Sequence, residues 1–498
     1  MLLGVGAGGV DPVDFVKLNT AQGNGNDRTS FHYGSDGSIY YHSIANTWKA
    51  IKLDAAGEIV FQKVFSSHSA GTTYGMAVGY QDIQIYMGST SGAYYNIWAL
   101  NKSGALLWNK RWHIDHSSDT NAGSSFVDHG QGASLRALPN ADIGLLLIEA
   151  PNVNNSSGSG ENRAPIMLSF KMTDGTKIGW GGARSSQSGT VSNMSIRDWA
   201  VCLGSGATQG YFTMISGKSL KNETGWKNMH RIKGSFYTAD HSGDKNIDFD
   251  SSATFLQSSG GHVDLQSANR GLDVLRDYSG TSIDSATLVV GNHAGAKIAY
   301  VNNSYHAGTW YDYAKNFNGT FIVTGCAKDP SDTNTIFISV QHEPSGQGYS
   351  NAVLTKITSN SLVWSRKFEL VSTHSDFNAN SGRMSLYPKD VIIHPSNGKG
   401  LLYVNPNGLP AFFCQFDTGS TAPSTGTYSL GTISGGTCTV VISSGPSDGT
   451  SSIGTPTTGT NTFTVMGDSD EYEPVTDSWT SGAVTDTSNV TYGGELWD

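Results

Sequence analysis

Oxygen-bearing side chains alternate along one polar segment, DHSGDKNIDFD at residues 240–250. These side chains belong to Asp240, Asp244, Asn246, Asp248 and Asp250. Carboxylate and amide oxygens are the ligands that a hard cation such as calcium prefers. However, the segment lacks the mid-loop glycine and the terminal bidentate glutamate of a calcium-binding loop. We therefore interpret it as a solvated loop and assign no metal ligand to it.

A second candidate is the pair of histidines in HIDH, residues 113–116. His113 and His116 are three residues apart in a segment that we expect to be a strand or a loop, so they face different directions unless the chain turns. Histidine is a common metal ligand. Two separate surface histidines are nevertheless the simpler interpretation.

A third candidate is TDGTKIGW, residues 173–180, which contains the Asp, Gly and Trp of the boxes repeated in propeller glycosidases and sialidases. Its spacing differs from those boxes, and the chain has no clear second copy. A glycosidase also needs a pair of carboxyl groups beside the scissile bond, and the sequence alone pairs none. We predict an ordinary hairpin turn here.

The remaining motifs carry no chemistry by themselves. GVGAGG near the N-terminus lacks the preceding strand and the following helix of a phosphate-binding loop. The four cysteines, at positions 202, 326, 414 and 438, form no CxxC pair, and we expect most of them to be small buried side chains. We therefore predict a protein that is not an enzyme and that has no catalytic residue, no cofactor-binding residue and no metal site.

Charge is distributed unevenly along the chain. The net charge is −10, no Lys, Arg or His follows Lys399, and ten acidic residues lie beyond it. The sequence has no cluster of basic residues for nucleic acid, whose phosphates require one. The longest apolar run, IGLLLI at 143–148, is too short to cross a bilayer. We expect neither nucleic-acid binding nor membrane insertion, and we expect no signal peptide at MLLGVGAGGVDPVDF because it lacks a basic start.

A two-part pattern recurs seven times along the sequence. The first part is a polar turn followed by a short apolar strand, as in SDGSIYYHS (35–43), YQDIQIYMGS (80–89), PNADIGLLLIEA (139–150), SGATQGYFTMIS (205–216), SIDSATLVVG (282–291), DPSDTNTIFISV (329–340) and HPSNGKGLLYV (394–404). The second part is a hairpin, clearest in WKAIKLDAAGEIVFQKVF (48–65), NIWALNKSGALLWNKRW (96–112) and AVLTKITSNSLVWSRKF (352–368). The unit of roughly 50–60 residues is the length of a four-stranded blade with its loops.

These units predict an all-β chain folded as a β-propeller of seven four-stranded blades. One small sheet cannot bury both of its faces, and a radial arrangement gives each sheet two neighbours. We expect the bulky residue after each hairpin turn to lie between neighbouring blades; these residues are Phe61, Trp108, Trp180, Trp310 and Trp364. The fourth unit is indistinct, so six or eight blades remain alternatives, as do two stacked β-sandwiches.

The repeats divide the chain into three parts. Residues 35–420 form the predicted propeller. Residues 1–34 precede it as an N-terminal arm, in which VDFVKLNT (13–20) could supply a strand that closes the ring. Residues 421–498 are an acidic extension rich in Thr, Ser and Gly, with two expected strands at 437–443 and 461–467. We interpret the extension as partly structured, with disorder as the alternative.

A family resemblance accompanies this pattern. The form ALNKSGALLW resembles the repeats of quinoprotein dehydrogenases and of the outer-membrane assembly lipoprotein that shares their repeat. As a whole, the chain is more similar to the propeller-bearing virion structural proteins of tailed bacteriophages, particularly marine ones. Three features carry that likeness: the glycine-rich start MLLGVGAGG, units that read DGSIYY followed by IKLDAAGEIVFQKVF, and the Thr/Ser/Gly-rich tail without basic residues.

The resemblance implies a structural protein of the virion, in the tail as part of a nozzle, fibre or spike. Its partners would be other virion proteins in an oligomeric assembly and a receptor on the host cell surface. A lectin-like propeller is one alternative, although the loops do not repeat as its ligand sites would. A propeller enzyme of quinoprotein or glycosidase type is the other. A quinoprotein would hold calcium near a catalytic Asp and often has a vicinal disulfide, which this sequence lacks.

Overall fold

Strands make up nearly all of the regular structure in the described part of the chain, which also contains one 3-10 turn, η1 (Tyr80–Asp82). The computed structural model describes residues 14–17, 31–43, 49–55, 57–65, 74–90, 94–114, 133–151, 163–185, 196–204, 208–216, 228–239, 246–250, 252–257, 272–274, 288–291, 297–301, 307–312, 319–359, 361–373, 382–394, 398–406, 409–419, 421–433, 436–446, 457–466, 474–477 and 484–486. No helix among these residues is long and apolar enough to cross a membrane.

Consecutive strands pair antiparallel in small sheets. The first sheet contains β2 (Phe31–Tyr33), β3 (Ile39–Ser43), β4 (Lys49–Leu53) and β5 (Ile59–Phe65). The second contains β6 (Tyr74–Val78), β7 (Gln84–Thr90), β8 (Tyr94–Leu100) and β9 (Leu106–Ile114). A further separate sheet contains β19 (Leu272–Val274), β20 (Leu288–Gly291), β21 (Lys297–Val301) and β22 (Ala307–Asp312).

A ten-stranded path combines two such runs. The first run contains β10 (Ala133–Ala137), β11 (Gly144–Pro151), β12 (Arg163–Phe170) and β13 (Lys177–Ser185). The second contains β14 (Ile196–Leu203), β15 (Gln209–Ser216), β16 (Asn228–Tyr237), β17 (Ile247–Phe249) and β18 (Ser252–Gln257). β33 (Thr457–Met466) joins the two runs because it pairs with both β13 and β18.

The last two sheets include strands from the ends of the described chain. One contains β23 (Gly319–Asp329), β24 (Asp332–Pro344), β25 (Asn351–Thr358), β26 (Ser361–Ser372), β27 (Arg383–Met384), β31 (Gly426–Ile433) and β32 (Gly436–Ser444). The other contains β28 (Leu386–Ile393), β29 (Lys399–Pro406), β30 (Phe412–Asp417) and β1 (Asp14–Lys17). β1 pairs with β30, so a strand from the N-terminal arm lies beside one from the end of the repeat region.

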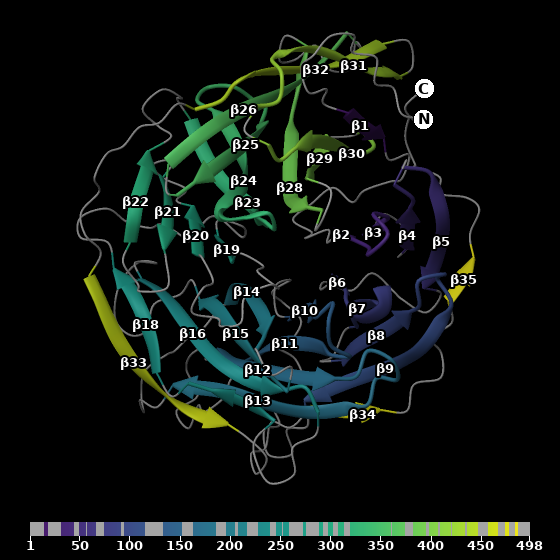
Figure 1. The fold of residues 1–498 in the computed structure, drawn as a ribbon, viewed down its shortest axis with the longest axis vertical. Helices are drawn as coiled ribbons and strands as arrows, with labels where there is room; N and C mark the ends of the chain where they lie inside the picture. The colour runs from purple at the N-terminus through teal and green to yellow at the C-terminus, as the bar shows by residue number, and fades with distance from the viewer. Residues whose placement is uncertain are drawn as a thin grey trace.

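The sheets are arranged around a common centre (Figure 1). The first strand of each run, such as β2, β6, β10 and β14, lies near the centre, and the last, such as β5, β9, β13 and β18, lies at the periphery. The all-β prediction is confirmed for the described residues, and their arrangement is propeller-like.

Local sequence explains the hairpins. In the turn between β8 and β9, the side-chain oxygen Oδ1 of Asn101 accepts hydrogen bonds from the backbone N–H groups of Ser103 and Ala105. Gly104 completes this turn at φ 81°, a left-handed conformation that costs glycine little. The turn between β4 and β5 is held in a similar way, since the side chain of Asp54 accepts a hydrogen bond from the backbone N–H of Glu58.

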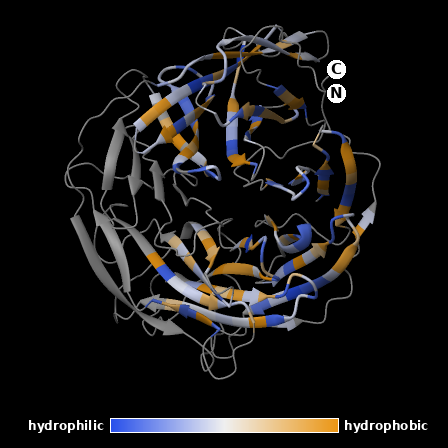
Figure 2. Cartoon of the chain, in the orientation of Figure 1, coloured by the Kyte–Doolittle hydropathy of each residue, from blue (hydrophilic) through white to orange (hydrophobic). Residues whose placement is uncertain are grey.

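Aromatic side chains pack between neighbouring sheets, as expected. Trp108 of β9 meets Phe170 of β12 edge to face, with ring centroids 5.7 Å apart. Trp364 of β26 lies 6.4 Å from Phe416 of β30, and Phe61 belongs to a core cluster that β7 and β8 complete. Trp180 is also buried. The side chain of Trp310 lies outside the described part of the structure. Figure 2 shows how hydrophobic and hydrophilic residues alternate along these strands.

Strands from residues 421–498 add to the outer edges of the sheets. β32 pairs with β26, β33 with β13 and β18, β34 (Pro474–Asp477) with β9, and β35 (Val484–Asp486) with β5. As the C-terminal segment proceeds, its strands therefore pair with sheets that come earlier and earlier in the chain. Its later strands, β33, β34 and β35, lie on the periphery (Figure 1). Both strands expected in this region, at 437–443 and 461–467, are present as β32 and β33.

Candidate functional site

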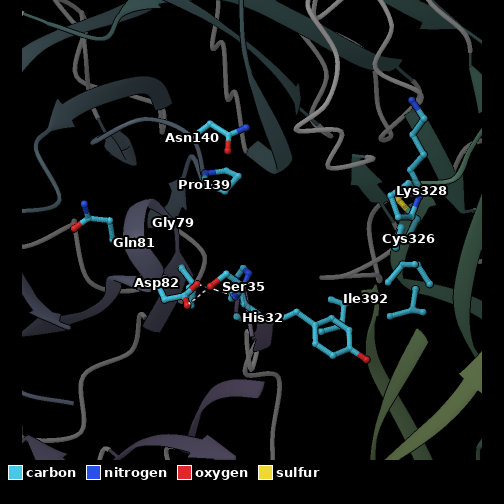
Figure 3. A pocket seen from close by; sticks show the side chains of 17 residues that line it. His32, Ser35, Gly79, Gln81, Asp82, Pro139, Asn140, Cys326, Lys328 and Ile392 are labelled. Carbon is cyan, nitrogen blue, oxygen red and sulfur yellow. Dashed lines mark hydrogen bonds between the residues drawn. The ribbon is translucent and has the colours of Figure 1, made fainter. Parts of the chain in front are cut away.

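A cavity of about 460 Å³ lies among the inner ends of several sheets. Its walls come from β2 and the turn after it, from β6 and η1, from the turn between β10 and β11, and from the ends of β23 and β28. We call this cavity the central pocket (Figure 3). Its volume is in the range of small-molecule sites.

A network of charged side chains supports one wall of the central pocket. Both carboxylate oxygens of Asp82 accept from Ser35, one from its backbone N–H at 2.8 Å and one from its hydroxyl at 2.6 Å. Lys102 Nζ lies 3.1 Å from an oxygen of Asp82 and 3.1 Å from an oxygen of Asp36. Asp82 is thereby neutralised, and it ties the first sheet to the second.

Asp36 extends this network toward Lys52, whose Nζ lies 3.6 Å away. Burial by itself raises the pKa of Asp36, but hydrogen bonds from Ser38 and Lys102 and the charge of Lys52 outweigh it. The pKa of this carboxyl therefore lies well below its usual value. The same two carboxylates raise the pKa of Lys102 through their hydrogen bonds. The two carboxylates, Asp36 and Asp82, are therefore balanced by the two ammonium groups of Lys52 and Lys102, as expected for a network that stabilises the fold.

The backbone of η1 is strained where it lines the central pocket. Gln81 and Asp82 have φ values of 55° and 57°, in the left-handed region that non-glycine residues rarely occupy. Hydrogen bonds from the N–H of Gly79 to the carbonyl of Ile83, and from the N–H of Ile83 to the carbonyl of Tyr80, hold this turn. Strain of about 1–3 kcal/mol per residue persists only where its surroundings impose it.

Tyr33 contributes a half-buried phenol ring to the lining. Its hydroxyl oxygen is inaccessible to solvent and has no hydrogen-bond partner among the described residues. Burial raises the pKa of Tyr33 well above its usual value, so the group stays protonated and can donate. The ring packs edge to face against His394, with centroids 4.8 Å apart. Neighbouring His32 also lines the pocket, and its Nε2 lies 3.3 Å from the carbonyl of Met76.

The polar and apolar parts of the lining lie on different elements. Aliphatic side chains of Val391, Ile392 and Ile393 come from β28, and Ala327 comes from β23. Amide side chains come from η1 and from the turn before β11. The arrangement offers hydrogen bonding beside an apolar wall. Among the described residues of the lining, Asp82 is the one with a carboxyl group, and its charge is already matched, so these residues do not supply the pair of groups that acid and base catalysis needs.

The Asp240–Asp250 segment is only partly described, since residues 240–245 lie outside the described chain. Asn246 donates its amide N–H to the carbonyl of Ile178 at 2.8 Å, so it joins β17 to β13. Asp248 is exposed in β17 and pairs with Ser235 of β16. Within the described part of the chain, no three His, Cys, Asp or Glu side chains cluster as metal ligands.

The other two sequence candidates are structural where they are described. TDGTKIGW forms the turn into β13, in which Asp174 accepts from the N–H of Thr176 at 2.7 Å and Gly175 adopts φ 68°; the prediction of a hairpin is confirmed. His113 lies in β9 with its ring 5.4 Å from that of Tyr94, and His116 lies outside the described residues. The four cysteines are buried, and none of them forms a disulfide.

Sequence reasoning did not single out the residues of the central pocket. His32, Gln81 and Asn140 are common residue types in short polar turns and lie far apart in the chain. One available signal was their position, since each lies in or beside the turn that joins the first two strands of a unit. Such turns meet only when the sheets are arranged around one centre.

Comparison with known proteins finds likeness at the level of structure alone. No protein-family model matches the chain, and no curated protein is similar to it in sequence. BBS1N, solved in complex with ARL6DN, matches with a TM-score of 0.41 and 8% identity over 83% of this chain and 99% of that one. A glycosyl hydrolase from Bacteroides ovatus matches with a TM-score of 0.24 and 8% identity over 57% of this chain and 82% of its own.

A third match is the Synechocystis apocarotenoid oxygenase, with a TM-score of 0.26 and 10% identity over 83% of this chain and 91% of that one. The three proteins have different activities or partners, and their similarity to this chain is low. The comparisons therefore assign no activity.

Proposed function

We propose that this protein is a non-catalytic structural component of a bacteriophage particle, located in the tail as part of a nozzle, fibre or spike. In this proposal the sheets are the seven four-stranded blades of a propeller. The seven runs of consecutive strands support that count, if the ten-stranded path is divided at β33. The virion assignment is supported by the sequence resemblance described above.

The observation that carries a role in assembly is a repeated pattern of exposed apolar side chains. They directly follow the hairpin turn into β5, β9 and β26, where aliphatic residues would otherwise be expected to be buried. These side chains are 40–53% exposed: Ile59 51%, Val60 53%, Leu106 40%, Leu107 42% and Val363 43%. We call them the rim aliphatics. Repeated exposed apolar groups favour contact with another protein.

The C-terminal strands leave the rim aliphatics uncovered. β35 pairs with residues 63–65 of β5, and β34 pairs with residues 111–114 of β9. β32 begins its pairing with β26 at Arg366. Among the described strands, none pairs with the outer edge of these strands next to the turn. Backbone donors and acceptors and apolar side chains are therefore available together to a neighbouring virion protein.

Quantitative mass spectrometry of density-purified phage particles tests this proposal. We expect a fixed small copy number per particle, such as six or a multiple of three. Absence from purified particles would refute the structural role. A variant that carries serine at Ile59, Val60, Leu106 and Leu107 should fold normally and enter particles poorly, whereas a matched control with Thr427→Ala on an exposed site elsewhere should enter normally.

A further inference from the structure

We propose that the outer edges of β5 and β9 are binding sites for a short acidic strand, and that two copies of this chain join when each places its β34 and β35 on these edges of the other. This inference deepens the proposed role in assembly and rests on it for its setting in a particle. Three observations carry it: the two strands repeat one sequence motif, they pair in the same way, and they are the shortest described strands of the C-terminal segment.

The repeated motif is Val-Thr-Asp. It forms the last three residues of β34, Val475–Asp477, and the whole of β35, Val484–Asp486. The sequence contains this triplet nowhere else, and β31, β32 and β33 of the same segment lack it. The same short strand therefore occurs twice in succession, beside two neighbouring sheets on the periphery (Figure 1).

The two strands also pair in equivalent registers. In each pairing the valine lies opposite a residue with a ring, and the aspartate lies opposite a basic residue. The four pairs are Val475–His113 and Asp477–Arg111 for β34 with β9, and Val484–Phe65 and Asp486–Lys63 for β35 with β5. Opposite charges at directly opposite positions stabilise a pair of strands. Each strand therefore carries the features that the edge of the other requires, so that strands and edges are interchangeable.

Charge determines what such a strand can bind. No Lys, Arg or His follows Lys399, so the C-terminal segment offers an acidic strand no basic partner. Like charges directly opposite one another destabilise a pair of strands. The outer edges of β5 and β9 supply Lys63 and Arg111 at the required positions. A strand from a second copy therefore binds to these edges rather than to the C-terminal segment of that copy.

The two strands are held by few contacts. β34 has 4 residues and β35 has 3, compared with 9 in β32 and 10 in β33. Thr476 and Thr485 are exposed, and the half-buried Val484 packs against the core cluster that includes Phe61 and Phe65. Short strands with little burial open at low cost. Exchange between copies then restores the same contacts, which is why strand exchange is a low-cost route to dimers.

The connection between the strands makes them one exchanging unit. Residues 478–483 link β34 to β35 and reach at most about 25 Å when fully extended. The two strands must therefore occupy neighbouring sheets of the same molecule, as β9 and β5 do. Residues 467–473 link this unit to β33.

A disulfide that fixes β35 to its own sheet tests the inference. Val64 and Thr485 lie directly opposite each other in β5 and β35, so Val64→Cys with Thr485→Cys can be oxidised in dilute solution to lock the strand within one molecule. Native mass spectrometry should show dimers of the unaltered protein that increase with concentration. The oxidised lock should reduce the dimer fraction at least tenfold, and reduction of the disulfide should restore it. A control lock between β26 and β32, Lys367→Cys with Ser443→Cys, should leave the dimer unchanged.

Complementary charge variants test recognition between copies. Lys63→Glu with Arg111→Glu alters the edges, and Asp477→Lys with Asp486→Lys alters the strands. In either variant alone, strands and edges carry like charges, and dimers should be lost. In an equimolar mixture, the strands of each variant match the edges of the other, so mixed dimers should exceed either homodimer at least tenfold. Circular dichroism checks that both variants are folded.

The inference is overturned if the unaltered protein is monomeric at every concentration up to its solubility limit, if the oxidised lock leaves the dimer fraction unchanged, or if the two charge variants form no mixed dimers. These measurements use the isolated protein and are independent of its presence in particles. A protein that is present in particles but exchanges no strands refutes this inference alone, whereas one that exchanges strands but is absent from particles refutes the proposed function.

Discussion

Replacing Trp108 by alanine removes a large side chain through which β9 contacts the neighbouring sheet of β12 and β13. The indole packs on Phe170, and its Nε1 donates to the carbonyl of Met172 at 2.7 Å. Its ring also lies against Gly175, where an added Cβ would approach within 2.9 Å. Three contacts from one side chain therefore cross this boundary between sheets.

The expected cost follows from burial and from the lost hydrogen bond. Trp108 is 9% exposed, and a buried tryptophan removes about 150–250 Å² from water. At about 25 cal/mol per Å² this corresponds to roughly 4–6 kcal/mol as an upper bound. Large-to-small replacements of buried aromatics cost about 3–5 kcal/mol. We expect Trp108→Ala to lower the free energy of unfolding by about 4 kcal/mol, and Trp108→Phe by about 1–2 kcal/mol.

The stability of both variants is measured by equilibrium urea unfolding followed by circular dichroism. The slope of the free energy of unfolding against urea concentration must be the same in the variants and in the unaltered protein. Leu107→Ala is the matched control, since this neighbour on the same strand is 42% exposed and should change stability by less than about 0.5 kcal/mol. If Trp108→Ala costs no more than Leu107→Ala, packing between sheets does not hold this part of the molecule together, and the reasoning is wrong.

Three further outcomes are expected. Val440→Ala in β32, fully buried against β26, should destabilise by about 2 kcal/mol in urea unfolding, and a cost near zero would show that this C-terminal strand does not belong to the core. Burial lowers the pKa of His42 to about 4 from an ordinary 6.5, so the unfolded chain binds the proton more readily than the folded one. About 3 kcal/mol of stability should therefore be lost as pH falls from 6.5 to 4. In His42→Phe, the free energy of unfolding measured against pH should lack this decrease. Ser359→Gly should stabilise the protein by up to about 1 kcal/mol and so raise its thermal midpoint, because the serine has a φ of 49°. A lower midpoint would contradict the inference that the backbone is strained at this residue.

The hairpins and the residues between the sheets could be predicted from the sequence because their causes are local. Asn101 and Gly104 determine one turn through side-chain capping and a positive φ, wherever the hairpin lies. Trp108 follows that turn at a fixed distance, and a large apolar side chain on an outer strand needs a neighbouring sheet to cover it. Repetition of the pattern then indicated a radial all-β arrangement.

The central pocket and the course of the C-terminal segment were decided by tertiary structure. Tyr33 and Ile392 lie at opposite ends of the repeat region, and they meet because the sheets surround one centre. Asn246 resembled a cation ligand in the sequence but donates to Ile178 across a sheet boundary. In the C-terminal segment, β33, β34 and β35 pair with strands that lie hundreds of residues earlier in the chain. They can do so because unpaired backbone groups at a sheet edge accept a strand from any part of the chain that reaches them. Composition and spacing describe a residue's neighbours along the chain, and these contacts depend on its neighbours in space.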